Sequence, residues 1–424
     1  MTLYRFPDTA HDTLSSQNLS PFIRDILSKA LTGIEVSQAE GEVLFRAQAN
    51  DFQAIADVAD ILRQRTCGNR VGFVINRNIN FTNVCYMGCT FCGFAKRSED
   101  PAAEWLIPEQ IVVRAREAWN RGATEVCIQG GLHPKMSGTY YREIVLAIKE
   151  ALPDMHIHAF SPFEVWYGAS KTKQSYVDFL QDLKDCGLGS MPGTAAEILD
   201  TDIRRQLTRN KLSTEKWVEI IKAAHHVGLP TTATIMYGHI DGPEHWAAHL
   251  SLLRDIQKET GGFTELVPLS FVHSESPLYT QNPESVRPGP TNLEVRKMHA
   301  IARIMLNGWI DNIQVSWTKL GAEFARELLM CGVNDLGGTL MNESISRSAG
   351  AAHGQEITAY EMCQVIQSSG EQPIQRNSIY GVIDDFSTGL PEQQAPLIKR
   401  QNSELLGFLS ENKNAPAQAL EGTG

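Results

Sequence analysis

The sequence lacks the features that place a protein in a membrane, outside the cell or on a nucleic acid. None of its 424 residues belongs to an apolar run of the roughly 18 residues needed to cross a bilayer. Residues 1–20 show no basic start followed by an apolar stretch, so they do not resemble a secretory signal. The net charge of -11 argues against binding to a phosphate backbone, which needs a basic face. We therefore expect a cytoplasmic protein with no nucleic-acid partner and no membrane contact.

Cysteines are few, and they are unevenly spaced. Of the eight, three lie together as Cys85, Cys89 and Cys92. The others are scattered, which argues against the disulfide framework of a secreted protein and favours a reducing compartment. We interpret these scattered residues as core thiols: they are Cys67, Cys127, Cys186, Cys331 and Cys363.

The rest of the composition predicts a globular protein with a sizeable core, since 42% of the residues are hydrophobic and 21% are charged. Apolar residues in the region 1–70 recur at helical spacing, and Ser37 with Glu40 matches a capping box. No linker rich in Pro, Gly or Ser follows this region. We therefore predict an N-terminal helical extension rather than a separate domain.

From residue 71 onward, short apolar runs alternate with helical patterns at the spacing, roughly 30 residues, of parallel βα units. Such an alternation predicts an α/β protein, and eight strands of this kind close a TIM-type (β/α)8 barrel. We assign the barrel to residues 71–356 and expect residues 357–424 to add a short C-terminal helix and a flexible polar tail. The predicted strands start near Val71, Thr124, His156, Leu188, Thr231, Glu265, Asn312 and Val333.

The three clustered cysteines follow the first predicted strand with the spacing C-x3-C-x2-C. Thiolates at this spacing on one loop can converge on a metal centre, and a closed iron–sulfur cluster normally takes four cysteines. Because no fourth cysteine lies nearby, one iron of a [4Fe-4S] cluster would stay open for a small ligand. The amino and carboxylate groups of S-adenosylmethionine suit an open iron, and reduction of the cluster would then release a 5'-deoxyadenosyl radical.

Other interpretations of the same cysteines remain. A structural zinc site would need a histidine, yet zinc ligands usually come in pairs and His133 is 41 positions beyond Cys92. Three unrelated structural thiols, or a cluster that only carries electrons, are further possibilities. The position of the loop favours the open cluster, because the loop after a barrel strand lies at the C-terminal mouth, where active sites of this fold are found.

Two other strand ends carry candidates for cofactor binding. Gln129, Gly130 and Gly131 end the second predicted strand, where glycines either let the backbone approach the methionyl amino group or make a plain tight turn. Glu197 and Arg209 follow the fourth strand. A carboxylate and a guanidinium there suit the ribose hydroxyls and the carboxylate of S-adenosylmethionine, or else form a surface pair on a helix.

Polar side chains at further strand ends are candidates for contact with substrate. His156 and His158 share one face of the third strand because they lie two residues apart. Taken singly, each such residue also fits a satisfied core group or an exposed loop, and their common location is what favours a site. We predict catalytic roles for His158, Glu164, Tyr237 and His239, with Ser161, Asp241, Glu265 and His273 nearby.

An aromatic residue, Phe91, directly precedes the last clustered cysteine, and this pattern resembles the radical SAM signature. We count Phe91 among the cofactor-binding residues for that reason. Longer stretches resemble one subfamily, the 4-hydroxybenzyl-transferring subunit of the deazaflavin precursor synthase, from about residue 61 to residue 370. These stretches are NINFTN (78–83), QGGLHP (129–134), HIHAFSP (156–162), PGTAAEIL (192–199), MYGH (236–239) and NESISR (342–347).

The resemblance implies a radical SAM transferase that uses a [4Fe-4S] cluster, held by the three clustered cysteines, and S-adenosyl-L-methionine. Members of this family cleave L-tyrosine at Cα–Cβ and transfer its 4-hydroxybenzyl group to 5-amino-6-(D-ribitylamino)uracil. They release 2-iminoacetate, methionine and 5'-deoxyadenosine. The motif at 192–197 is shared with the aminofutalosine synthases of menaquinone biosynthesis, which remain the alternative.

The resemblance also implies partners. Some organisms fuse this subunit to a second radical SAM domain, but this chain is too short for the fusion and contains one cysteine triplet. We therefore expect a separate radical SAM subunit that closes the deazaflavin ring, and an electron donor.

Overall fold

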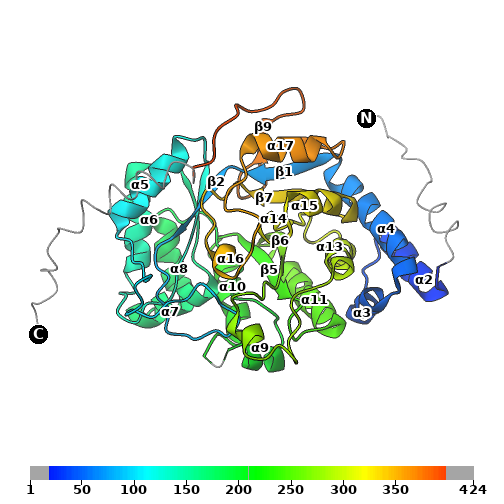
Figure 1. Ribbon diagram of the computed structural model, residues 1–424, viewed down its shortest axis with the longest axis horizontal. Coiled ribbons are helices and arrows are strands. Elements are labelled where there is room, and N and C mark those ends of the chain that lie inside the picture. Colours follow the sequence, from blue (N-terminus) through cyan, green and yellow to red (C-terminus); the bar gives the residue numbers. More distant parts are fainter. Residues whose placement is uncertain (1–18, 209, 398–424) are drawn as a thin grey trace, which may run out of the picture.

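The computed structural model describes residues 19–208 and 210–397. Parallel strands form a ring (Figure 1). The barrel strands are β1 (Arg70–Val74), β2 (Asn76–Asn80), β3 (Glu125–Gln129), β4 (His156–Ala159), β5 (Thr231–Tyr237), β6 (Phe263–Ser270) and β7 (Asp335–Gly338). The first two strands are separated by one residue and act as a single barrel strand. In the ring, β2 pairs with β3, β3 with β4, β5 with β6, and β7 with β1.

Two of the eight predicted strand positions are reduced to isolated parallel bridges. Residues 190–191 join β4 to β5, and residues 313–314 join β6 to β7. These are the positions expected near Leu188 and Asn312. With them included, eight parallel positions close the ring, because β7 pairs with β1. The predicted (β/α)8 barrel is therefore confirmed.

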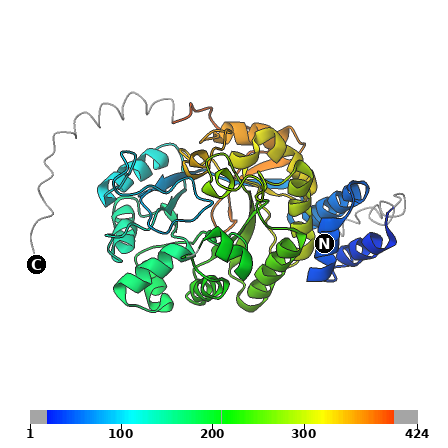
Figure 2. The same ribbon diagram turned by 60° about the horizontal axis from the view of Figure 1, so that its bottom comes forward.

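Helices follow the strands and cover the outside of the ring, as Figures 1 and 2 show from two directions. Their apolar faces pack inward; in the first of them, Ile111, Ala115 and Ala118 are buried at helical spacing. The longer helices are α5 (Pro108–Trp119), α6 (Tyr140–Ala151), α7 (Pro162–Thr172), α8 (Tyr176–Asp185), α10 (Thr214–His226), α11 (Pro243–Thr260), α13 (Asn292–Leu306) and α15 (Ala322–Leu328). Short helices lie in the connecting loops: α9 (Thr201–Leu207), α12 (Pro277–Thr280), α14 (Trp317–Leu320) and α16 (Ile345–Ser348). Of these, α14 and α16 contribute side chains to the inside of the ring.

Three described helices precede the barrel: α2 (Pro21–Leu31), α3 (Gln38–Arg46) and α4 (Ala49–Cys67). The expected capping box starts α3, since Glu40 Oε2 accepts from Ser37 N at 2.7 Å and Ser37 Oγ accepts from Glu40 N at 3.3 Å. α4 packs on α13 and α3 packs on α11, so the extension lies against one side of the ring (Figure 2). None of the described helices has the length and apolar character needed to cross a membrane.

The chain after the barrel contains more than the predicted helix. α17 (Ala359–Gln367) is that helix, and a β-hairpin follows it. β8 (Gln372–Arg376) pairs in parallel with β1, and β9 (Val382–Asp385) pairs antiparallel with β8. The description of residues 357–424 as a helix and a tail was therefore incomplete. The polar composition of β8 and its proline, Pro373, hide the strand, because proline is depleted inside sheets.

Candidate active site

A cavity of about 440 Å³ lies inside the barrel, lined by strand residues and by the loops that follow the strands. Its volume is typical of sites that bind small molecules. The strand register arranges its polar side chains in layers, because alternate residues of a strand face the same side. By register the layers are Asn76 with Glu125, then Asn78 with Cys127 and His158, then Gln129.

The three clustered cysteines line this cavity, and none of them is in a disulfide. Burial raises the pKa of Cys89 to about 11 and also raises the pKa of Cys92, so thiolates are expected to form on metal binding rather than before it. Within the described part of the chain, no three His, Cys, Asp or Glu side chains converge closely enough for one ion. A [4Fe-4S] cluster spreads its thiolates over different irons. Three free thiols around one cavity fit such a cluster with one iron left open.

A buried ion pair lies beside the cysteine loop. Glu197 accepts from Lys211 Nζ at 2.5 Å and lies 3.6 Å from Arg204. Burial opposes the charge on Lys211, but the charge of Glu197 and its hydrogen bond to the ammonium outweigh burial and raise the pKa of the lysine. The Lys211 ammonium lies 4.8 Å from the centre of the Phe91 ring, a cation–π distance.

The sequence predicted Glu197 and Arg209 as contacts to S-adenosylmethionine, and it did not predict Lys211. Arg209 lies outside the described residues. The signal for Lys211 was its position two residues further along the same segment, but a basic residue in a loop is ordinarily solvated, and only the fold brings this one to a carboxylate.

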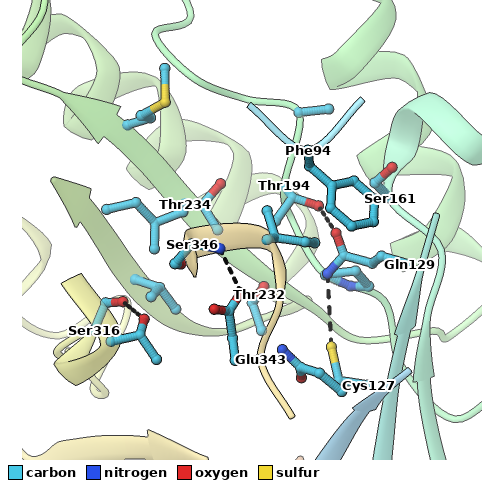
Figure 3. Close-up of a pocket in the computed structure, with 18 of the residues that line it drawn as sticks. Phe94, Cys127, Gln129, Ser161, Thr194, Thr232, Thr234, Ser316, Glu343 and Ser346 are labelled. Atoms are coloured by element: carbon cyan, nitrogen blue, oxygen red, sulfur yellow. Dashed lines mark hydrogen bonds between the residues drawn. The ribbon is translucent and has the colours of Figure 1, made fainter. Parts of the chain in front are cut away.

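The end of β3 passes very close to the chain that leads into the cysteine loop. An added Cβ would lie 2.5 Å from the Phe81 ring at Gly130, and 2.3 Å from the Val84 carbonyl oxygen at Gly131. Both glycines also line the cavity, together with Gln129, whose Oε1 accepts from Thr194 Oγ1 at 3.0 Å (Figure 3). The close approach in the structure is to the protein's own chain, which requires glycine at both positions. Contact of these glycines with the methionyl amino group stays a prediction.

Two of the four predicted catalytic residues lie on the cavity wall. His158 Nδ1 is 2.7 Å from Ser190 Oγ, and burial lowers the pKa of this histidine to about 4. Glu164 accepts from Ser161 N at 2.7 Å and from Gly130 N at 3.0 Å. Burial raises the pKa of Glu164 to about 7, although these hydrogen bonds act in the other direction.

The other two, Tyr237 and His239, are fully buried and are not among the described residues that line the cavity. Tyr237 accepts from Ser270 Oγ at 3.4 Å, and its ring packs 5.8 Å from that of Trp246 on α11. His239 Nδ1 lies 3.0 Å from Asp241 Oδ1. This geometry gives neither side chain a contact with a ligand in the cavity, and it assigns them to packing behind the wall.

Cys127 also departs from expectation. The sequence predicted a core thiol, whereas in the structure Cys127 lines the cavity. Gln129 Nε2 donates to its Sγ at 3.8 Å (Figure 3). Because burial raises the pKa of this thiol, it stays protonated and makes one wall of the cavity weakly polar.

The C-terminal hairpin forms the floor of the cavity, at the N-terminal ends of the strands. Arg376 of β8 donates from Nε to Asp335 Oδ2 at 2.5 Å and from Nη2 to Asp335 Oδ1 at 2.8 Å, and it lies 3.3 Å from Glu265. Tyr380 donates to Glu265, and Ser378 donates to Glu125. The carboxylates at the start of three barrel strands are thus paired with a segment that the sequence analysis read as a tail.

Comparison with family models divides the chain into two matched regions. Residues 79–253 match the model of the radical SAM superfamily, and residues 260–388 match that of the CofH/MqnC C-terminal region. The first region contains the cysteine loop, and the second contains the hairpin floor.

Several curated proteins are similar in sequence. The chain is 46% identical over 368 residues to the 5-amino-6-(D-ribitylamino)uracil--L-tyrosine 4-hydroxyphenyl transferase of Methanothermobacter thermautotrophicus, covering 87% of this chain and 100% of that protein. It is 51% identical over 341 residues to the FO synthase of Nocardia farcinica, covering 80% of this chain and 39% of that protein. The FO synthase of Mycobacterium tuberculosis is 49% identical over 81% of this chain and 40% of its own length. The chain thus spans about two fifths of the FO synthases it matches.

Solved structures share the fold at low sequence identity. HydG, a maturase of the [FeFe]-hydrogenase, has a TM-score of 0.67 at 15% identity, over 87% of this chain and 79% of HydG. Methylornithine synthase (PylB) has a TM-score of 0.65 at 19% identity, over 82% of this chain and 97% of PylB.

Proposed function

The chain belongs to the radical SAM superfamily and, within it, to the family of the 5-amino-6-(D-ribitylamino)uracil--L-tyrosine 4-hydroxyphenyl transferases, and on this premise we propose that it catalyses that transfer. L-Tyrosine would lose its side chain by cleavage at Cα–Cβ, and the 4-hydroxybenzyl group would join the aminouracil. The observation that carries the proposal is the alignment over the whole length of a transferase with this activity in its name, in a chain whose cysteine triplet lines the cavity inside the barrel.

We propose that Cys85, Cys89 and Cys92 hold a [4Fe-4S] cluster, next to which S-adenosylmethionine binds. Bound there and reduced, these two groups would supply 5'-deoxyadenosyl radical chemistry for the removal of hydrogen from tyrosine. The proposed cofactor-binding wall consists of Phe91, Gln129, Gly130, Gly131 and Glu197, to which the described residues add Lys211. By pairing with Glu197, Lys211 fixes the carboxylate as an acceptor for ribose hydroxyls.

The remaining residues bind, orient and exclude water. A closed ring, with the hairpin as its floor, keeps solvent from a reactive radical. His158 is neutral at physiological pH because burial depresses its pKa, so it offers a hydrogen bond without adding charge. Glu164, with a pKa of about 7, holds or releases a proton at the wall beside Gly130.

We propose a second radical SAM component for closure of the deazaflavin ring, and a protein or chemical electron donor for the cluster. The match to only two fifths of the FO synthases supports the second component, since the larger proteins contain more than this barrel.

The proposal is tested by anaerobic reconstitution with iron and sulfide, followed by dithionite, S-adenosylmethionine, L-tyrosine and the aminouracil. We expect a 4-hydroxybenzyl–aminouracil adduct by mass spectrometry, together with 5'-deoxyadenosine. Cleavage of S-adenosylmethionine without the adduct would contradict the substrate assignment. The aminofutalosine-type alternative predicts instead that product forms only from the substrates of the aminofutalosine synthases.

A further inference from the structure

Two residues that line the cavity in the described part of the chain each carry a buried acceptor atom without a partner. Among the described residues, Glu343 Oε2 and Asn78 Oδ1 are buried without a hydrogen-bond partner. Both residues line the cavity, and Glu343 is only 5% exposed. A buried acceptor without a partner is destabilising unless a ligand supplies a donor. The wall around these two atoms is therefore incomplete without a molecule that carries N–H or O–H groups.

A cation lies on the same wall. Lys319 Nζ donates to Ser346 Oγ at 2.9 Å, and Ser346 N donates to Glu343 Oε1 at 2.8 Å. Ser346 thus lies between Lys319 and Glu343, and within residues 19–208 and 210–397 these two side chains form no direct ion pair. An ammonium has three N–H donors. Within the described residues, only the Ser346 hydroxyl accepts a hydrogen bond from Lys319. Burial lowers the pKa of Lys319, while the charge of Glu343 opposes that shift.

The backbone before Glu343 is held in an unfavourable conformation. Residues 340–342 have φ values of +67°, +36° and +108°, and none of them is glycine. Such values are uncommon for residues with a Cβ and are found where the surroundings enforce them, often at functional sites. Here Leu340 N donates to Asn76 Oδ1 at 3.0 Å and Glu343 N donates to Gln355 O at 2.9 Å. The protein therefore imposes the position of the Glu343 carboxylate.

We propose that Glu343, Asn78 and Lys319 form the subsite for the zwitterionic head of the amino-acid substrate. The two free acceptors bind the α-ammonium group, and the lysine donates to the α-carboxylate. The inference rests on the proposed function, which supplies tyrosine as the substrate. A zwitterion compensates a buried anion and a buried cation at once, whereas the uncharged ring of the aminouracil leaves both uncompensated.

This subsite is separate from the wall proposed for S-adenosylmethionine. Figure 3 shows Glu343 and Ser346 on one segment that crosses the cavity, joined by their hydrogen bond, with Gln129 and Thr194 on other segments. The tyrosine head would thus be fixed by the chain after β7. Its side chain would extend into the remaining space between that chain and the cysteine loop.

The test measures equilibrium binding to the reconstituted enzyme with S-adenosylmethionine present and no reductant, so that no turnover occurs. Three ligands are titrated by calorimetry: L-tyrosine, tyramine, which lacks the carboxylate, and 3-(4-hydroxyphenyl)propionate, which lacks the amine. We expect Lys319→Met to weaken binding of tyrosine and of the propionate by about 30-fold or more, and to leave tyramine within about 2-fold. Glu343→Gln should weaken tyrosine and tyramine similarly and spare the propionate.

Two sets of controls accompany the variants. Lys222→Met and Glu259→Gln remove an exposed ion pair between α10 and α11 and should leave all three affinities unchanged. If either charge variant fails to take up iron, Asn78→Ala provides the same test of the ammonium contacts, with weaker tyrosine and tyramine binding expected.

The outcomes separate this inference from the proposed function. If the wild-type enzyme forms the adduct but the variants keep wild-type affinity for tyrosine, the subsite assignment is overturned and the function stands. If the variants lose affinity for the aminouracil and not for tyrosine, the wall binds the heterocycle and the assignment is likewise overturned. If the wild-type enzyme binds tyrosine yet yields no adduct, the function fails while the subsite survives.

Discussion

Replacing Arg376 by methionine should destabilise the fold by about 3–5 kcal/mol, the cost of removing one partner from a buried ion pair. Its guanidinium is 4% exposed and makes two hydrogen bonds to Asp335, which is 0% exposed, and it also lies against Glu265. Without the arginine, two buried carboxylates face each other. Methionine roughly preserves the length of the side chain, so most of the loss comes from charge.

The pH dependence of this loss follows from the two carboxylates. Burial already raises the pKa of Glu265 and of Asp335 in the folded protein. A carboxyl whose pKa is higher in the folded state binds more protons there than in the unfolded chain, so its contribution to stability falls as the pH rises. Loss of the Arg376 charge should raise both values further. The deficit of the variant should therefore be larger at pH 8 than at pH 5.

Urea denaturation of the metal-free protein, followed by tryptophan fluorescence under reducing conditions, measures the loss. Lys222→Met, at the exposed pair with Glu259, is the matched control and should cost about 0–1 kcal/mol. The double variant Arg376→Met/Asp335→Asn should recover part of the stability, because one unpaired charge is removed. A loss from Arg376→Met no greater than that of the control would refute the account of the floor.

Three further predictions concern the cavity wall. Cys89→Ala should abolish retention of the cluster, measured as iron per chain after anaerobic reconstitution, whereas Cys186→Ala, away from the cavity, should keep it. Gly131→Ala should lower cluster content by pushing the Val84 carbonyl, whereas Gly389→Ala meets no atom within 4 Å and should be neutral; equal content in both would contradict the packing argument. His158, with a pKa of about 4 when folded, stays neutral while the unfolded chain takes up a proton below about pH 6.5, so it should cost the wild type about 2 kcal/mol of stability between pH 8 and pH 5. His158→Asn should flatten that part of the pH profile, and an unchanged profile would show that the imidazole is not desolvated.

The sequence predicted the barrel because the signals involved are local. Alternating strand and helix patterns revealed all eight strand positions, including the two near Leu188 and Asn312 that form only single bridges. The cysteine loop was equally readable, since its spacing and its place after the first strand are properties of one short segment. Helix starts such as Ser37 were readable for the same reason.

It was harder to predict from the sequence whether a strand residue faces the cavity or the surrounding helices. In β5 the residues that line the cavity are Thr232, Thr234 and Met236. Tyr237 has the opposite parity and therefore packs outward against α11. A position at a strand end shows that a residue lies near the mouth of the barrel. Whether its side chain faces inward follows only if one residue of the barrel strands is known to face inward. The alternating polar residues Asn76, Asn78 and Asn80 indicate the inward side of the first barrel strand.

Pairs of charged residues that meet only in the folded protein could not be predicted from the sequence. Lys211 becomes part of the site through Glu197, and the floor depends on Arg376 meeting strands that begin far earlier in the chain. Neither segment has a periodic apolar pattern that marks it. Their roles follow from electrostatic pairing that exists only after the ring has closed.

The hydrogen bonds differ between the floor of the cavity and the part of the wall that contains Glu343. At the floor, each carboxylate is satisfied by the protein: Glu125 by Asn76 and Ser378, and Glu265 by Gln314 and Tyr380. On the wall, Glu343 keeps one oxygen free. Removing a satisfied group leaves its partners unpaired, whereas removing a free acceptor relieves the folded protein of a desolvated charge.

Floor and wall substitutions should therefore separate in two measurements. Arg376→Met should lower the free energy of unfolding while leaving the ratio of tyrosine to tyramine affinity unchanged in the molecules that remain folded. Glu343→Gln should leave the stability of the ligand-free protein equal or higher, and it should weaken amine binding. If Glu343→Gln instead destabilised the ligand-free protein as much as the floor variant does, its carboxylate would be a structural group, and the wall would have no acceptor reserved for substrate.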